Sequence, residues 1–277
     1  MQHCLITGCS SGIGLCAAET FHARGYRVVA TVRNEEDKRH LEQIGIQVVL
    51  MDLADENSVT SAFQQALFLL DNRIDALFNN AAYGQPGAVE DLSRQALREQ
   101  FETNVFGTQQ LTNLAIAQMR LQGFGRIVYN SSVLGLVALG YRGAYNASKF
   151  AIEALADTLR IELYGSNIHV SLIEPGPITS RFRANAFAKY KQHIDKTRSA
   201  HLSIYEATEA RLNKVGPAAP FTLPADAVVQ KCIHAFESEH PRRRYYVTFP
   251  TYLFAYTKRL LPSALLDWLC RKVSDSD

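Results

Sequence analysis

Near its N-terminus the chain reads Leu5-Ile6-Thr7-Gly8-Cys9-Ser10-Ser11-Gly12-Ile13-Gly14. A short apolar run leads into a turn with three glycines, and a helical pattern follows over Gly12 to Ala23. Glycine permits tight backbone paths, and a helix N-terminus presents free N–H groups to an anion. The stretch therefore predicts a strand, a phosphate-binding turn and a helix in succession. Its spacing is G-x-x-x-G-x-G, which differs from the G-x-G-x-x-G of the usual dinucleotide fingerprint.

The same alternation continues along the chain. The other apolar runs are Tyr26 to Val32, Ile46 to Met51, Ile74 to Phe78, Arg126 to Asn130, Ile168 to Glu174 and Tyr245 to Phe249. Further helical patterns cover Ser58 to Leu70, Ala96 to Gln122, Ala144 to Tyr164 and Ala225 to Glu237. Continuous apolar runs are typical of strands buried on both faces of a parallel sheet. The pattern predicts an α/β fold, a Rossmann-like doubly wound parallel sheet of about seven strands with helices on both faces.

The length of 277 residues allows one or two domains, and we expect a single domain over 1–277. A polar, basic insertion at about 180–222 is interpreted as a substrate lid, or else as an ordinary solvated helical excursion. The tail, about 250–277, is apolar with cationic flanks, and Pro262 should interrupt any helix there. It either lies on an anionic membrane surface as a peripheral contact, or packs on the body, rims the substrate pocket or forms a subunit contact.

Composition narrows the class of protein. The formal net charge of +2 gives no electrostatic case for a nucleic-acid partner. Five cysteines without C-x-x-C or zinc spacing predict neither a disulfide framework nor a metal site. With no signal-peptide pattern and no apolar run of about 20 residues, a cytoplasmic protein is expected.

The end of the second apolar run bears on the choice of cofactor. An NAD site usually has an acidic residue here for the ribose 2′-hydroxyl, whereas this chain has Arg33. A guanidinium matches a phosphate with paired hydrogen bonds, so we favour NADP(H), with Ser11 as a second donor. Alternatively Arg33 is a solvated loop arginine, and Glu35 and Glu36 would repel a phosphate if they turned inward.

A candidate acid–base pair lies further along, because Tyr145 and Lys149 share one helix face at i and i+4. Free tyrosine has a pKa of about 10. A nearby ammonium would lower that pKa toward neutrality, where general acid–base catalysis works best.

Together these motifs make the chain resemble the short-chain dehydrogenase/reductase family over roughly residues 3–180. The matching elements, in the family's order, are Gly8-x-x-x-Gly12-x-Gly14, Asn79-Asn80-Ala81-Ala82, Ser131-Ser132, Tyr145-x-x-x-Lys149 and Pro175-Gly176. Ala82 stands where the family more often has glycine.

The resemblance implies four catalytic residues. Tyr145 exchanges the proton with the substrate oxygen, and Lys149 lowers the tyrosine pKa and bonds the nicotinamide ribose. The family's serine precedes its tyrosine by thirteen residues, which selects Ser132 over Ser131 as the group that hydrogen-bonds the substrate oxygen. Asn104 holds a water that links Lys149 to solvent, or else makes a structural polar contact.

The resemblance also implies a cofactor site. Its residues are Gly8, Ser10, Ser11, Gly12, Ile13, Gly14, Arg33, Asp52, Leu53, Asn79, Ala81, Tyr145, Lys149, Pro175, Gly176, Ile178 and Thr179. Asn79 ties neighbouring strands and approaches the adenosine ribose. Asp52 meets the adenine amino group, or else is a turn or helix-start aspartate. The Pro175–Thr179 segment bonds the nicotinamide carboxamide.

A closer likeness joins the chain to the 17β-hydroxysteroid and retinol dehydrogenase branch, and its tail resembles bacterial NADP-dependent aldehyde reductases. The expected function is NADPH-dependent, reversible reduction of a small apolar aldehyde or ketone. The alternatives are an NADP-dependent hydroxysteroid or retinol dehydrogenase and a catalytically idle NADPH-binding sensor. The family often pairs through the helices that hold Asn104 and Tyr145, which implies a homodimer or homotetramer.

Overall fold

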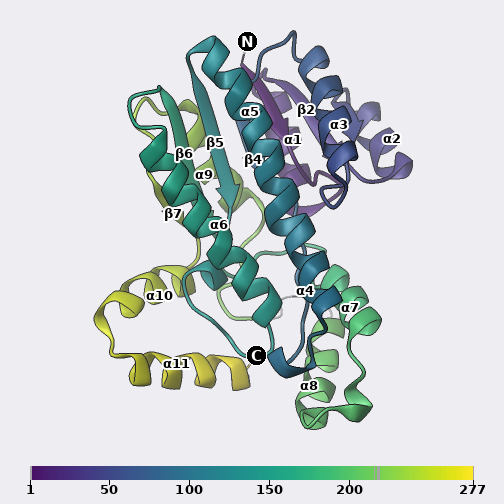
Figure 1. Cartoon of the computed structure of the whole chain (residues 1–277), viewed down its shortest axis with the longest axis vertical. Coiled ribbons are helices and arrows are strands. Elements are labelled where there is room, and N and C mark those ends of the chain that lie inside the picture. The colour runs from purple at the N-terminus through teal and green to yellow at the C-terminus, as the bar shows by residue number, and fades with distance from the viewer. Residues whose placement is uncertain (1, 215, 217–218, 277) are drawn as a thin grey trace.

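A computed structural model describes residues 2–214, 216 and 219–276. Within them one parallel sheet runs in the order β3-β2-β1-β4-β5-β6-β7 (Figure 1). The strands are β1 (His3–Ile6), β2 (Arg27–Val32), β3 (Gln47–Leu50), β4 (Ala76–Asn79), β5 (Gly125–Asn130), β6 (Ile168–Glu174) and β7 (Arg244–Tyr246). The predicted seven-stranded, parallel α/β architecture is confirmed.

Helices cover both faces of the sheet. On one face lie α1 (Gly12–Ala23), α2 (Glu35–Gln43) and α9 (Asp226–Glu237). On the other lie α3 (Glu56–Leu69), α5 (Thr108–Gln122) and α6 (Gly143–Glu162). Successive strand residues alternate between the two cores, so Cys4 and Ile6 pack with the first set and Leu5 with the second. This double burial explains why the strands are continuous apolar runs.

The predicted helix over Ala96 to Gln122 is not continuous, which corrects that expectation. It consists of α4 (Arg94–Phe101), a π-helical segment (Glu102–Gly107) and α5. A side chain on Gly107 would collide with the backbone carbonyl of Leu53, so the loop after β3 packs directly on the helix there. Widened turns of this kind often occur at functional sites, and this one contains Asn104.

Two helical pairs lie outside the sheet and its covering helices. The predicted lid contains α7 (Phe182–His193), a 3₁₀ turn (Lys196–Arg198) and α8 (Leu202–Asn213). The tail contains α10 (Phe249–Leu260) and α11 (Ser263–Ser276), separated at Pro262 as expected. The last strand is shorter than its apolar run, because Phe249 begins α10. Within the described residues no helix has both the length and the apolarity to cross a membrane.

Candidate active site

The glycine turn connects β1 to the N-terminus of α1, at the carboxyl-terminal edge of the sheet. The amide N of Cys9 donates 2.9 Å to the carbonyl oxygen of Thr31, which fastens the turn to the end of β2. A Cβ on Gly14 would overlap the carbonyl oxygen of Gly8 and lie 2.6 Å from Asn80 Nδ2. Only glycine fits there. Ser11 is the N-cap of α1, yet its side chain makes no capping hydrogen bond and stays available to a ligand.

Asn80 holds this turn in place, although the sequence reading singled out only its neighbours Asn79 and Ala81. Its Nδ2 donates 2.9 Å to the carbonyl oxygen of Thr7. The Thr7 hydroxyl oxygen accepts from the amide N atoms of Asn80 and Ala81, at 2.9 and 3.0 Å. The sequence does show an amide side chain, that of Asn80, directly after a buried strand. It does not show which turn this side chain holds, because the glycine turn is distant in the chain.

Asn79 has a different partner from the one expected. Its Nδ2 donates 2.8 Å to the Thr112 hydroxyl, so the side chain joins β4 to α5 rather than to a neighbouring strand. Its Oδ1 is buried and has no hydrogen-bond partner in the described structure. An unpaired acceptor of this kind is costly unless a ligand or water completes it.

Asp52 and Leu53 follow β3. Asp52 is exposed, and its Oδ1 accepts 3.0 Å from the amide N of Ala54, the local geometry of a turn aspartate. Leu53 is buried against α3 and α5. Asp52 thus has the geometry of a turn aspartate, which is one of the two roles that the sequence left open.

Arg33 follows β2 directly and is exposed. It forms no ion pair with any residue that the structure describes, and it lies close enough to Tyr83 to lower the pKa of that phenol against the stronger effect of burial. Glu35 and Glu36 lie in the first turn of α2 instead, where the helix dipole favours carboxylates. Arg33 therefore directly follows the strand to which the glycine turn is bonded, and none of the described residues forms an ion pair with its guanidinium.

The Pro175–Thr179 segment leaves β6 at the same edge of the sheet. The carbonyl oxygen of Pro175 accepts 2.8 Å from the amide N of Val133, which follows Ser132. The amide N of Thr179 donates 3.0 Å to the carbonyl oxygen of Leu223, which ties the segment to the chain after the lid. Ile178 packs on the α1 side of the core, as does Ile13.

Tyr145 and Lys149 lie on the first turns of α6, with the Lys149 Nζ 5.6 Å from the centroid of the tyrosine ring. Burial raises the pKa of Tyr145 to about 12, and interaction with the Ser132 hydroxyl opposes this rise. The net pKa of Tyr145 therefore lies above its ordinary value, because burial outweighs the opposing influences. Burial lowers the pKa of Lys149 to about 8, against the attraction of Glu153.

The two adjacent serines have separate partners. The Ser131 hydroxyl donates to Glu153 in the interior. The Ser132 Oγ accepts 3.1 Å from the amide N of Leu134 and lies on the side of Tyr145. Of the two serines, Ser132 is therefore the one placed with the tyrosine.

Behind these residues lies a buried charge cluster that the sequence did not reveal. Arg244 of β7 donates to Glu153, to Glu174 at 2.8 Å and to Asp157 at 2.7 Å. Glu174 is fully buried, and its Oε2 has no hydrogen-bond partner in the described structure. Burial, and secondarily the charge of Glu153, raise the pKa of Glu174, while Arg244 lowers it.

Asn104 makes structural polar contacts through its side chain. Its Oδ1 accepts 3.1 Å from the amide N of Tyr83, and its Nδ2 donates to the Tyr83 carbonyl and to the Ser148 hydroxyl, at 2.9 and 3.1 Å. The bond to Ser148 joins the π-helical segment to α6 between Tyr145 and Lys149.

The lid contacts the site through Phe182, whose ring stands edge-on to that of Tyr145 with centroids 5.2 Å apart. Tyr190 and Tyr205, by contrast, are buried within the lid's own core. The Tyr205 hydroxyl accepts 2.9 Å from the amide N of Ala88 and donates 2.5 Å to Asp91. Two aromatic residues of the lid thus stabilise it, whereas Phe182 reaches the tyrosine.

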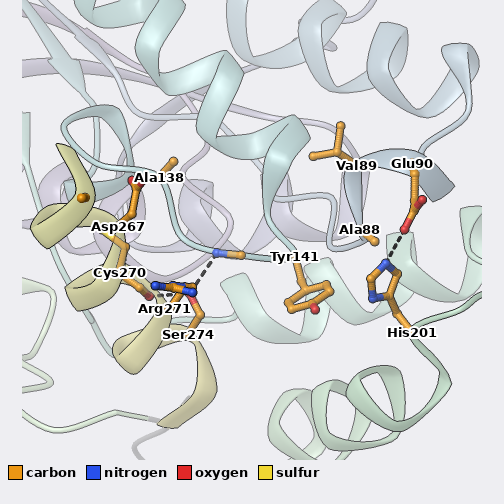
Figure 2. Close-up of a pocket in the computed structure, with 12 residues that line it drawn as sticks. Ala88, Val89, Glu90, Ala138, Tyr141, His201, Asp267, Cys270, Arg271 and Ser274 are labelled. Carbon is orange, nitrogen blue, oxygen red and sulfur yellow. Dashed lines mark hydrogen bonds and ion pairs between the residues drawn. The ribbon is translucent and has the colours of Figure 1, made fainter.

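A cavity of about 1090 Å³ opens beside this region, between the lid and α11 (Figure 2). Tyr141 stands between Glu90 and His201 on one side and Asp267, Cys270, Arg271 and Ser274 of α11 on the other (Figure 2). The loop with Tyr141 leads directly into α6, so the cavity adjoins the catalytic helix. None of the predicted site residues lines it.

The structure thus brings the glycine turn, Arg33, the Pro175–Thr179 segment and the Tyr145 cluster to one edge of a doubly wound sheet, where such sheets bind ligands. A family model described as short chain dehydrogenase matches residues 2–191. The chain belongs to the short-chain dehydrogenase family. It is accordingly an oxidoreductase that binds a nicotinamide cofactor and a small-molecule substrate.

Several members of the short-chain dehydrogenase family are similar over much of the chain. The uncharacterized oxidoreductase YbbO of Escherichia coli is 43% identical over 95% of this chain and 91% of its own. An NADPH-dependent 3-dehydrocapnine reductase of Ornithobacterium rhinotracheale is 30% identical, covering 96% and 95%. Human retinol dehydrogenase 8 is 37% identical, covering 67% and 61%, as the resemblance to that branch predicted.

A solved short-chain dehydrogenase from Burkholderia phymatum, in complex with NAD, has the same fold. It superposes with a TM-score of 0.75 and 26% identity, covering 94% of this chain and 92% of its own. Relatives with different nicotinamide cofactors thus share this architecture, so the choice between them depends on residues at the site.

Proposed function

We propose that this protein reduces an apolar aldehyde or ketone with NADPH, in a reversible reaction. The observation that carries the cofactor assignment is the exposed Arg33, which directly follows the strand bonded to the glycine turn and has no ion-pair partner among the described residues. A 2′-phosphate would supply the missing negative charge, and Ser11 offers a second donor. The NADPH dependence in the name of the Ornithobacterium relative supports the same choice.

The residues present fit a dinucleotide. The glycine turn is so tight that a side chain at Gly14 would fill it, and the N-terminus of α1 faces it with free N–H groups. Gly8 to Gly14 would hold the pyrophosphate, Asn79 the adenosine side, and Lys149 with the Pro175–Thr179 segment the nicotinamide side. When bound, NADPH supplies the hydride.

Tyr145, Ser132 and Lys149 provide the proton chemistry. A phenol with a pKa of about 12 keeps its proton at neutral pH, so Tyr145 is in the form that donates to a carbonyl oxygen. The Ser132 hydroxyl donates a hydrogen bond to the same oxygen and stabilises the charge that develops there. The Lys149 ammonium, 5.6 Å from the tyrosine ring centroid, stabilises the phenolate that remains. Asn104 positions α6 through Ser148.

Phe182 supports an apolar substrate, since its ring lies against Tyr145 and shields the site from water. The test is NADPH consumption with a panel of aliphatic, aromatic, retinoid and steroid carbonyls. We expect turnover with apolar aldehydes or ketones. Preferred turnover of steroids or retinoids would favour a hydroxysteroid or retinol dehydrogenase. Tight NADPH binding without turnover of any member would refute the reductase and favour a sensor.

Membership of this family also supports a homodimer or homotetramer, formed through α5 and α6. Both helices carry a large exposed apolar residue, Leu121 on α5 and Ile161 on α6. Phe106, just before α5, and Tyr164, just after α6, are also exposed. Light scattering should show an oligomer that Ile161→Glu dissociates. A monomeric wild-type protein would contradict this arrangement.

A further inference from the structure

We propose that the outer face of α10 binds the surface of an anionic lipid bilayer. This α10 face consists of the side chains Phe249, Tyr252, Leu253, Tyr256 and Leu260, which are 59, 42, 40, 59 and 79% exposed. Their spacing of i, i+3, i+4, i+7 and i+11 places them in one stripe along the helix. The inference goes beyond the proposed reaction and does not depend on it.

The stripe is not the side by which α10 packs on the protein. Thr251, Phe254 and Ala255 form the opposite, buried side. Phe254 packs with Val137 and Cys270. The helix is therefore apolar on both sides, one satisfied by the protein and one facing outward. A continuous exposed apolar surface of this kind is typical of an interaction site.

The charge around the stripe favours an anionic lipid surface over another occupant. α10 contains no carboxylate, and Arg259 stands at its end, whereas the Lys258 ammonium lies over the Phe150 ring, 4.6 Å from its centroid. The sequence of the following helix has two cations, Arg271 and Lys272, and two aspartates, Asp267 and Asp275. Arg271 and Asp267 line the cavity, whereas Lys272 lies one helical turn after Trp268. Cations at the edge of an apolar face attract anionic headgroups, and tyrosine rings suit the boundary between lipid and water.

The neighbouring segments extend the apolar surface. Phe221, 60% exposed, contacts Phe249 with ring centroids 5.1 Å apart. On α11, Leu265 and Trp268 are 46 and 50% exposed, one helical turn apart. Because no helix in the described chain can cross a membrane, these helices would lie in the plane of the interface.

Trp268 makes the inference directly measurable, because it is the only tryptophan in the chain. Full-length protein is mixed, without cofactor or substrate, with vesicles of phosphatidylglycerol and phosphatidylcholine, and with vesicles of phosphatidylcholine alone. We expect co-sedimentation and a blue shift of the tryptophan emission with the anionic vesicles. Salt at about 1 M should release the protein, because the Debye length falls to about 3 Å.

The variant that tests the surface is Leu253→Glu with Tyr256→Glu. It should weaken vesicle binding by about tenfold or more, because two inserted apolar side chains become charged. The control is Phe68→Glu, which alters an even more exposed apolar residue (77%) on α3 and should leave vesicle binding unchanged. Thermal melting and turnover of a water-soluble aldehyde should stay at the wild-type level in all variants.

Three results would overturn the proposal. One is the absence of binding to anionic vesicles by the folded wild-type protein. Another is equal binding by the wild type and the Leu253/Tyr256 variant. The third is a wild-type oligomer that this variant, but not Ile161→Glu, converts to monomers, which would make the α10 face a contact with a second copy. Vesicle binding is measured without turnover. The membrane proposal can therefore fail while the reductase assignment stands, and the reductase assignment can fail while the membrane proposal stands.

Discussion

The Lys149 ammonium donates a 2.7 Å hydrogen bond to the backbone carbonyl oxygen of Asn130. The Asn130 side chain in turn donates 2.9 Å to Asn80 Oδ1, and Asn80 holds the carbonyl of Thr7 before the glycine turn. These bonds run from α6 across the ends of β5 and β4 to β1. The first turns of α6 and the glycine turn are therefore positioned as one unit, which would place the proposed proton-transfer and phosphate-binding groups within reach of one dinucleotide.

Replacing Tyr145 with phenylalanine removes the phenol that interacts with Ser132 and Lys149. We expect kcat to fall by about 10²- to 10⁴-fold, the usual contribution of a general acid, while NADPH binding measured by fluorescence is retained. Tyr164→Phe, at a tyrosine that is 93% exposed, is the matched control and should be fully active. An active Tyr145→Phe enzyme would show that another group supplies the proton.

Removing the Arg33 guanidinium tests the choice of cofactor. Arg33→Ala should raise the Kd of NADPH by about tenfold or more, the scale of a lost charge-assisted hydrogen bond, and leave that of NADH nearly unchanged. Titration calorimetry with both cofactors measures the difference. Arg94→Ala, at another exposed arginine, should affect neither. Equal weakening of both cofactors would place the 2′-phosphate contact elsewhere.

The tightness of the glycine turn predicts the effect of a single methyl group. Gly14→Ala should abolish cofactor binding and destabilise the protein by at least about 1–3 kcal/mol, because the new Cβ would overlap the Gly8 carbonyl oxygen. Gly140→Ala is the comparison, since a Cβ there makes only an ordinary contact, 3.5 Å from Ser274 Oγ. Thermal melting with and without NADPH measures both effects. Normal NADPH binding by Gly14→Ala would contradict the cradle.

The buried Glu174 predicts how stability depends on pH. Because burial raises its pKa in the folded protein, the folded state keeps a proton that the unfolded chain releases above about pH 4.5, its ordinary pKa. Stability should therefore fall as the pH rises from that value until the folded pKa is passed, by at most about 1.4 kcal/mol per pH unit.

Urea unfolding over this pH range measures the slope. Glu174→Gln should flatten it, since the amide cannot ionise, whereas Glu206→Gln, at an exposed carboxyl, should leave it as in the wild type. A Glu174→Gln profile that parallels the wild type would show that Glu174 ionises normally in the folded protein.

The sheet could be predicted from the sequence because both of its faces are buried, which makes each strand a continuous apolar run such as Ile168 to Glu174. The π-helical segment could not be predicted, because it depends on the close approach of Leu53 to Gly107. These two residues are distant in the chain. Periodicity within one helix carries no information about such a contact.

The candidate site divides in the same way. Residue type, spacing and the family resemblance were enough to propose Tyr145, Lys149, Ser132 and the glycine turn as site residues. The pKa of Tyr145 could not be predicted in this way. Burial raises this pKa, and burial depends on the whole fold. The partners of Asn79 and Asn104 likewise come from other elements, α5 and α6. Short motifs therefore identify the reacting groups, whereas their electrostatics are tertiary properties.

The packing of the tail has a consequence for how this enzyme family diversifies. Val133 and Val137, just after Ser132, pack with Phe254 of α10 and Cys270 of α11. These helices lie beyond residue 191, where the match to the family model ends. The segment directly after Ser132 thus packs on a part of the chain that lies outside the residues matched by the family model. Exchanging or reshaping that part offers a route to new substrates that leaves Ser132, Tyr145 and Lys149 in place.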